Sequence, residues 1–283
     1  MKYLFFFAFA FCLFGFKPSN KLKLPKSYKF IPSGSFQTAD GAKTINAFYM
    51  LNHEVTNLEY KEFLYDIKKQ GKDSLYQACY PDTLGWQQTG GYTTPLVKHY
   101  FSHPAYHNYP VVNVSAYGME QFCKWLTGKL QIMYGNQINE ARLPSEDEWK
   151  YAAKGGLQLA DYPWGGPYVQ NAEGEYLANF QIIGDHNLTA GEDGPIVLSD
   201  STYGPDLSIL DNAFFTAVAE SYTPNGYGLY NMSGNVAEYT SDGKARGGHW
   251  RSYGGDIRIN SEITFEKPNP YVGFRPVITY LSK

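Results

Sequence analysis

The sequence predicts one α+β domain with little regular secondary structure, on three observations. Hydrophobic residues make up 43% and aromatic residues 17% of the 283 residues, which is enough apolar content for a large packed core. Helical periodicity is confined to the first half of the chain. From about residue 160 the chain becomes rich in Gly, Asn, Pro and aromatic residues, which predicts loops with short strands.

The first expected element is an export signal over residues 1–19. Lys2 supplies the positive charge, and residues 4–16 form an uncharged apolar run that is too short to span a bilayer comfortably. Cys12 lies in this run, but Phe11 precedes it where lipidation signals normally have a small side chain. We therefore expect an exported protein, periplasmic or associated with the outer membrane, with a lipid anchor as the less favoured alternative.

Two cysteines, Cys79 and Cys123, lie outside this signal. An oxidising compartment permits a disulfide between them. The apolar helical face around Cys123, "YGMEQFCKWL", instead favours a buried free thiol. The sequence leaves both possibilities open.

The next segment, "YKFIPSGSFQTA", predicts a strand, a turn at Gly34 and a second strand. A first helix is expected within residues 52–71, capped by Thr56 or Asn57 and ended by Gly71. Its predicted core face consists of Tyr60, Phe63, Leu64 and Ile67.

Two further helices follow in the sequence. One begins after Ser115, and the other begins after Ser145, which forms a capping box with Glu148 and precedes a stop at Gly155. The inward face of the helix after Ser115 is predicted to consist of Met119, Phe122, Cys123 and Leu126.

Charge and motif content exclude several function classes. The formal net charge is −3 and the basic residues are scattered, so nucleic acid is not an expected partner. No phosphate loop, H-E-x-x-H motif or Ser-His-Asp order is present. His99, His103 and His107 have helical spacing, but Pro104 and Pro110 favour a loop and structural histidines.

Seven stretches, taken together and in this order, resemble the formylglycine-generating enzyme (sulfatase-modifying factor) family. They are "NHEVTNLEYKEFL", "YPVVNVSAYGMEQFCKWL", "ARLPSEDEWKYAAKGG", "YPWGG", "PNGYGLYNMSGNVAEYTSD", "ARGGHW" and "GFRPV". The resemblance covers nearly all of the chain after residue 30 and implies a sulfatase-modifying-factor-like domain over residues 27–283. It also implies a variant C-type-lectin-like fold with loops ordered by calcium.

A narrower likeness is carried by "YPDTLGWQQTGGYTTPLVKHYFSHPAYHNYPVV" and "YPWGGPYVQNAEGEYLANF". These stretches resemble the gliding-motility and type IX secretion branch of that family, whose members are structural parts of the cell envelope.

The family's oxidation depends on two cysteines that bind copper(I), a metal that prefers soft thiolate ligands. Aligned without gaps, their positions fall on Ser252 and Ile257. Neither residue supplies a thiolate, so we expect no copper, no catalytic residues and no formylglycine-generating activity. The residues expected to line the former active-site cleft are His249, Trp250, Arg251, Ser252 and Tyr253.

The resemblance also implies structural calcium, which binds hard oxygens on flexible loops. Transferred to this sequence, one site uses the carbonyls of Ser233, Gly234 and Val236 with the carboxylate of Glu238. The residues of a second site are Asn179, Phe180, Asp211 and Ala213.

Two functions stay open. The first is a non-catalytic envelope protein that binds a protein or a glycan. The second is an enzyme, an oxidoreductase or non-haem metal enzyme, with altered chemistry in the same cleft, which the neighbouring His249 and Ser252 allow.

Overall fold

The computed structural model describes residues 24–280 apart from 39–40, 183–187, 191–195 and 199–212. The expected export signal at 1–19, Cys12 and Asp211 therefore lie outside the described residues. Within the described part of the chain, no helix is both long enough and apolar enough to cross a membrane.

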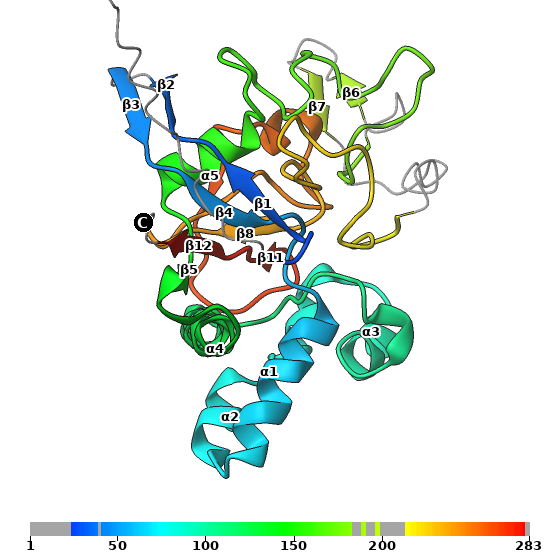
Figure 1. Cartoon of the computed structure of the whole chain (residues 1–283). Coiled ribbons are helices and arrows are strands. Elements are labelled where there is room, and N and C mark those ends of the chain that lie inside the picture. The colour runs from blue at the N-terminus through cyan, green and yellow to red at the C-terminus, as the bar shows by residue number, and fades with distance from the viewer. Residues whose placement is uncertain (1–23, 39–40, 183–187, 191–195, 199–212, 281–283) are drawn as a thin grey trace, which may run out of the picture.

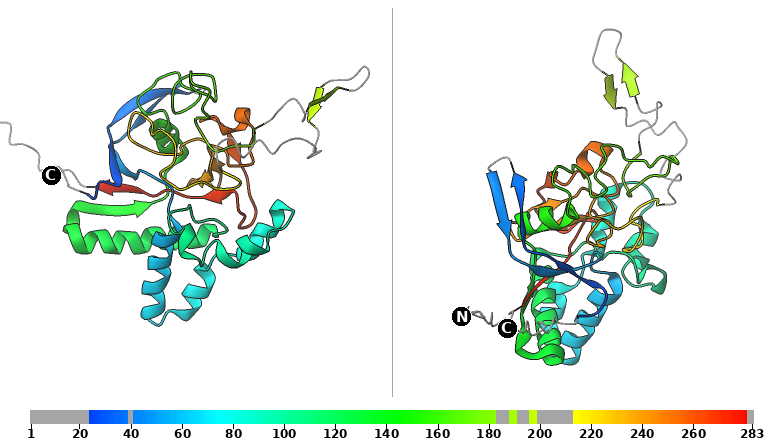
Figure 2. Two further views of the ribbon diagram at one scale, coloured as in Figure 1. Left: turned by 90° about the vertical axis from the view of Figure 1, so that its right-hand side faces the viewer. Right: turned by 45° about the horizontal axis from the view of Figure 1, so that its top comes forward.

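A four-stranded antiparallel sheet divides the molecule into two sides (Figure 2). Its order is β1 (Tyr28–Ile31), β4 (Phe48–Leu51), β12 (Val277–Tyr280) and β5 (Ile138–Arg142). The last strand of the chain thus lies between two strands from its first half. All four residues of β4 are buried, because helices cover one face of the sheet and loops cover the other.

The strand prediction around Gly34 is right about the strands and wrong about the turn. Strands β1 and β2 (Gly34–Thr38) do not pair with each other, because β1 pairs with β4 and β2 pairs with β3 (Gly41–Ile45). Gly34 is the first residue of β2, where a Cβ atom would lie 2.4 Å from the Tyr151 hydroxyl oxygen. Close packing against Tyr151, and not a turn, accounts for this glycine.

Helices α1 (Asn57–Lys69), α2 (Asp73–Cys79) and α4 (Ala116–Tyr134) pack against one another on one side of the four-stranded sheet, which we call the helical side (Figure 1). The predicted caps are confirmed, since the Thr56 side chain accepts from the Glu59 amide and the Ser115 side chain accepts from the Gly118 amide. The predicted core faces are also confirmed: Tyr60, Phe63, Leu64, Ile67, Met119, Phe122, Cys123 and Leu126 are all buried.

The histidine-rich segment contains more helix than we predicted. Short helix α3 (Thr94–His99) ends at His99, and one 3₁₀ turn covers Pro104–Tyr106. An earlier 3₁₀ helix spans Thr83–Thr89 and another spans Gly135–Gln137. His103 and His107 lie outside α3, so the three histidines do not share one helix.

The second half of the chain has the loop-dominated character that its composition predicts. Helix α5 (Glu146–Ala153) begins at the expected capping box, and no α-helix follows it among the described residues. A second small sheet has the order β10 (Glu262–Ile263), β9 (Ala245–Arg246), β8 (Ala237–Tyr239) and β11 (Val272–Gly273). A separate hairpin pairs β6 (Leu188–Ala190) with β7 (Ile196–Leu198), and a 3₁₀ turn covers Gly254–Ile257.

Candidate functional site

Two glycines after β9 shape the loop that carries the predicted cleft residues. Gly247 and Gly248 have φ values of 82° and 68°, which non-glycine residues rarely adopt. A Cβ atom on Gly247 would lie 2.9 Å from the Met232 carbonyl oxygen, and one on Gly248 would lie 2.6 Å from the Asp256 carbonyl oxygen. Both conformation and space therefore require glycine at this turn.

Residues 249–253 follow this turn, and we call them the aromatic loop. The rings of His249 and Trp250 lie 4.6 Å and 5.4 Å from the ring of Tyr271. Trp250 also lies 6.3 Å from the buried ring of Trp86, and its indole nitrogen donates to the Pro270 carbonyl at 3.1 Å. Segments that are distant in the sequence thus meet in one aromatic cluster.

The neighbouring His249 and Ser252 do not form a nucleophile–base pair. The Ser252 hydroxyl accepts from the backbone amide of His249 at 3.0 Å, while Nδ1 of His249 accepts from the Arg251 amide at 3.1 Å. Both interactions hold the turn together. Burial, and secondarily the Arg251 charge, lower the pKa of His249 to about 4, so the imidazole is neutral at pH 7.

Arg251 is the exposed member of the aromatic loop. Its guanidinium lies 6.0 Å from the centre of the Trp250 ring and donates to the Thr89 carbonyl at 2.7 Å. Ser252 is buried, and Tyr253 is half-buried at the start of the 3₁₀ turn. Arg251 is therefore the residue of the loop most open to a partner, while His249, Trp250 and the neighbouring Tyr271 are half-buried around it.

The two positions predicted to correspond to the family's copper-binding cysteines have structural roles. Ser252 fixes the turn as described, and Ile257 is fully buried in an apolar cluster with Tyr162 and Phe180. Cys79 and Cys123 are free, buried thiols in α2 and α4 on the helical side of the molecule. Burial raises the pKa of Cys79 to about 11 and raises the pKa of Cys123 further, which suppresses the thiolate form that copper(I) binds.

The predicted calcium loop at 231–238 contains a buried ion pair. The Glu238 carboxylate accepts from Arg275 Nε at 3.0 and 3.1 Å and from the Trp149 indole at 2.8 Å. A calcium ion at Glu238 would have to share this carboxylate with Arg275. The oxygen donors that fit calcium without such competition are the backbone carbonyls of Ser233, Gly234 and Val236.

The second predicted calcium segment packs directly against the first. The Asn235 amide donates to the Asn179 carbonyl at 2.8 Å, and a Cβ atom on Gly234 would lie 2.3 Å from that same oxygen. The Asn179 side chain donates to the Phe215 carbonyl at 2.7 Å. Phe180 is buried beside these residues, and Ala213 is the first described residue after the 199–212 gap.

A buried carboxylate that the sequence did not reveal, Glu54, joins these loops to the sheet. Its two oxygens accept from the side-chain amides of Asn235 at 2.9 Å and Asn231 at 3.1 Å. Burial raises the pKa of Glu54 to about 7, although the nearby Arg275 charge opposes this rise. The stretch "NHEVTN" contains Glu54, but only the folded chain brings its asparagine partners from residues 231 and 235.

Other buried or half-buried arginines pair with carboxylates and anchor the loops around them. Arg246 is fully buried and pairs with Glu146 at 3.1 Å and Asp242 at 2.6 Å, as well as with Glu262. Glu148 pairs with Arg142. Among the described residues, no three His, Cys, Asp or Glu side chains are grouped to hold a metal.

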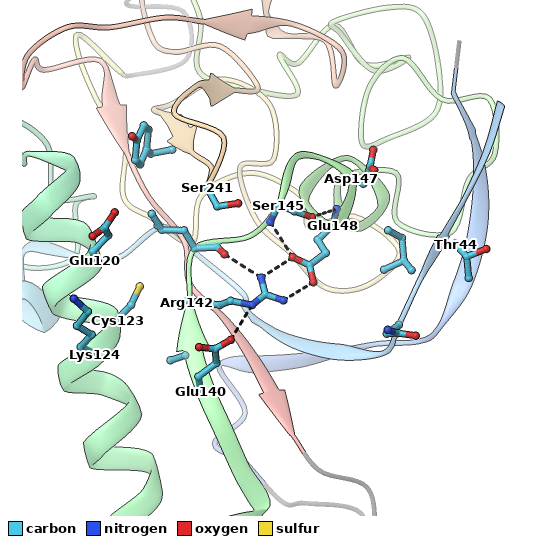
Figure 3. Close-up of a pocket in the computed structure, with 15 residues that line it drawn as sticks. Thr44, Glu120, Cys123, Lys124, Glu140, Arg142, Ser145, Asp147, Glu148 and Ser241 are labelled. Atoms are coloured by element: carbon cyan, nitrogen blue, oxygen red, sulfur yellow. Dashed lines mark hydrogen bonds and ion pairs between the residues drawn. The ribbon is translucent and has the colours of Figure 1, made fainter. Parts of the chain in front are cut away.

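The Arg142–Glu148 pair lies in a pocket of about 690 Å³ between α4, β5 and α5 (Figure 3). Glu148 binds the guanidinium through two contacts of 2.7 Å, and Glu140 adds a third at 3.4 Å. The lining holds two cations, Arg142 and Lys124, against four carboxylates, Glu120, Glu140, Asp147 and Glu148, so this pocket does not favour an anionic substrate.

Comparison with known proteins connects this arrangement to a family. Residues 16–280 match the family described as Sulfatase-modifying factor enzyme 1-like domain. The formylglycine-generating enzyme of Mus musculus is 28% identical over 218 residues, which are 70% of this chain and 50% of that protein. The chain thus spans about half the length of that relative.

Two more similarities bear on function and fold. The "Inactive C-alpha-formylglycine-generating enzyme 2" of Bos taurus is 26% identical over 242 residues, covering 75% of this chain and 69% of that protein. The solved structure of Treponema denticola variable protein 1 superposes with a TM-score of 0.55 at 18% identity, covering 88% of this chain and 94% of that one. At this identity the superposition shows a shared fold alone.

Proposed function

Because this chain belongs to the sulfatase-modifying factor enzyme 1-like family, we propose that it is a non-catalytic member that binds a partner through its aromatic loop. The observation that carries the proposal concerns the two residues aligned with the family's copper-binding cysteines. Ser252 holds a turn and Ile257 fills an apolar cluster, while both described thiols are buried on the helical side. The chain also resembles a relative whose name describes it as inactive.

The chemistry of the aromatic loop supports recognition of a protein. Trp250, Arg251 and Tyr271 lie together beside a neutral His, and Trp, Arg and Tyr are the residue types enriched at the hot spots of protein–protein interfaces. Trp250 and Tyr271 can also stack on a sugar ring, so a glycan is the second candidate partner. The buried Ser252 and the turn-bound His249 do not favour the enzymatic alternative.

The cellular setting of the proposal is the cell envelope. The apolar run at 4–16 supports export, and the resemblance of residues 80–112 to the gliding-motility and type IX secretion branch supports a partner from that machinery. Calcium is the structural ion in this proposal. The carbonyls of Ser233, Gly234 and Val236, with Asn179 and Phe180 beside them, would hold the loops that position Trp250.

A cross-linking experiment tests the binding function. A photo-reactive amino acid replaces Arg251 in the native cell envelope, and a second strain carries it at the exposed Lys26 as a control. A discrete adduct at 251 that is absent at 26 and is lost in the Trp250→Ala background is expected. Identical adducts at both positions would count against the aromatic loop as a binding site.

A separate assay tests the absence of catalysis. The purified protein is incubated with copper and a Cys-containing sulfatase peptide, beside an active formylglycine-generating enzyme as positive control. We expect no conversion of the cysteine. Turnover dependent on this protein would overturn the non-catalytic assignment.

A further inference from the structure

A second surface lies on the helical side of the molecule, away from the aromatic loop (Figures 1 and 2). Helices α1, α2 and α4 enclose a groove of about 650 Å³, which we call the helical groove. Its lining contains five large apolar side chains and four lysines: Phe63, Ile67, Leu75, Trp125, Ile132, Lys69, Lys72, Lys124 and Lys129.

The apolar residues of the groove extend to the protein surface. Ile132 is 84% exposed, and its neighbour Met133 is 59% exposed. Large apolar side chains that lie exposed beside an apolar groove are typical of a surface that a partner covers.

A glycine in the middle of α4 points to the same conclusion. Gly128 lines the groove, and a Cβ atom built on it would meet no other atom within 4 Å. Glycine weakens a helix interior relative to alanine, and packing within this chain does not require its small size. A partner that approaches the α4 backbone closely would require it.

The positive charge of the groove indicates that its partner is acidic. Lys69, Lys72 and Lys124 form no ion pair with any other described residue, whereas Lys129 pairs with Asp66 at 2.6 Å. Asp66 is the only acidic residue among those lining the groove, which gives the lining a net charge of +3. This concentration of positive charge contrasts with the formal charge of −3 for the whole chain.

We propose that the helical groove binds an acidic amphipathic helix of a protein partner. Apolar side chains spaced at i, i+3 or i+4 and i+7 would cover Leu75, Trp125 and Ile132, and flanking carboxylates would pair with the free lysines. The apolar floor is recessed between helices, so a helix can reach it more readily than the flat surface of a membrane. This site is separate from the aromatic loop and does not depend on its proposed function.

Synthetic peptides provide the probe. The acidic peptide is a helix of about 18 residues, or five turns, with Leu on one face and Glu on the other. The basic peptide replaces every Glu with Lys, and a scrambled acidic peptide keeps the composition but loses the apolar face. Fluorescence anisotropy is expected to show binding of the acidic helix about tenfold tighter than either control, weakening as salt rises.

Two variants of the full chain make the test specific. Gly128→Leu fills the groove, so it is expected to abolish binding while leaving the melting temperature unchanged or higher, because leucine favours a helix. A triple charge reversal is expected to make the protein prefer the basic peptide over the acidic one. Its substitutions are Lys69→Glu, Lys72→Glu and Lys124→Glu. A matched reversal of the exposed Lys26, Lys98 and Lys267 changes the net charge equally and is expected to leave the preference intact.

Three results would overturn the proposal. One is equal binding, or no binding, of the acidic and basic peptides by the folded wild-type protein. A second is lysine-dependent binding to vesicles of phosphatidylglycerol and phosphatidylethanolamine without binding of the peptide, which would make the groove a membrane contact. A third is self-association in sedimentation experiments that Gly128→Leu abolishes, which would make the occupant a second copy of this chain.

Discussion

Arg275 and Glu238 form an ion pair that solvent does not reach, with side-chain exposures of 0% and 1%. Arg275 also donates to the carbonyls of Leu51 at 3.1 Å and Tyr230 at 2.7 Å. One guanidinium therefore joins the central sheet, the loop before β8 and β8 itself. Glu238 lies at the end of the loop predicted to bind calcium, so this ion pair fixes that end of the loop.

Removal of Arg275 is expected to destabilise the fold strongly. In Arg275→Met the Glu238 carboxylate would stay buried without a counter-charge, which costs about 3–5 kcal/mol. Urea unfolding of the variant measures this loss. The exposed Arg251→Met serves as the control and should cost less than about 1 kcal/mol, since surface substitutions rarely cost more. Similar losses in both variants would contradict the role assigned to the ion pair.

Calcium is expected to raise the melting temperature of the purified protein. An ion that binds only the folded state stabilises it by about 2.7 kcal/mol at a hundredfold excess over its dissociation constant. Differential scanning calorimetry with calcium, with magnesium and after chelation measures the effect. Magnesium should stabilise less, because it accepts flexible carbonyl ligands poorly. Identical melting with calcium and with chelator would remove calcium from the proposal.

His249 is expected to make the protein less stable in acid. Its folded pKa of about 4 lies below its ordinary value of 6.5, so between these values the unfolded state binds more protons. Stability from this group is therefore complete above pH 6.5 and is lost as the pH falls toward 4, by about 3 kcal/mol in full. Urea unfolding between pH 4 and 7 should show a smaller loss in His249→Phe, which keeps an aromatic ring beside Tyr271.

Glu54 is expected to make the protein less stable as the pH rises, which is the opposite of the effect of His249. Its folded pKa of about 7 lies above the ordinary 4.5, so the native state binds the extra proton between these values. Its contribution to stability is present below pH 4.5 and is lost as the pH rises toward 7. The stability of Glu54→Gln should thus rise more steeply than that of wild type from pH 5 to 6.5. A slope equal to the wild-type slope would show that Glu54 does not titrate in this range.

Gly128→Ala is expected to stabilise the protein by about 1 kcal/mol, the difference between glycine and alanine in a helix interior. The new methyl group meets no atom within 4 Å, so no strain offsets this gain. Thermal unfolding measures it. Gly34→Ala provides the contrast, because its Cβ would lie 2.4 Å from the Tyr151 hydroxyl oxygen and should destabilise the fold.

Local patterns in the sequence determined helices α1, α4 and α5. Thr56, Ser115 and Ser145 cap them as predicted, because a cap depends on residues within one turn of the helix start. The apolar spacing likewise identified the buried faces of α1 and α4. The family resemblance, carried by contiguous motifs, is confirmed by the match over residues 16–280.

Only the tertiary structure decided which residues meet. The pairing of β1 with β4, the contact of Trp86 with Trp250 and the ion pair of Arg275 with Glu238 join positions that are distant in the chain. No local pattern encodes such partners, because they depend on how the whole chain packs. Burial decides the charge state of Glu54 and His249 for the same reason: the pKa of a side chain depends on the neighbours that folding brings to it.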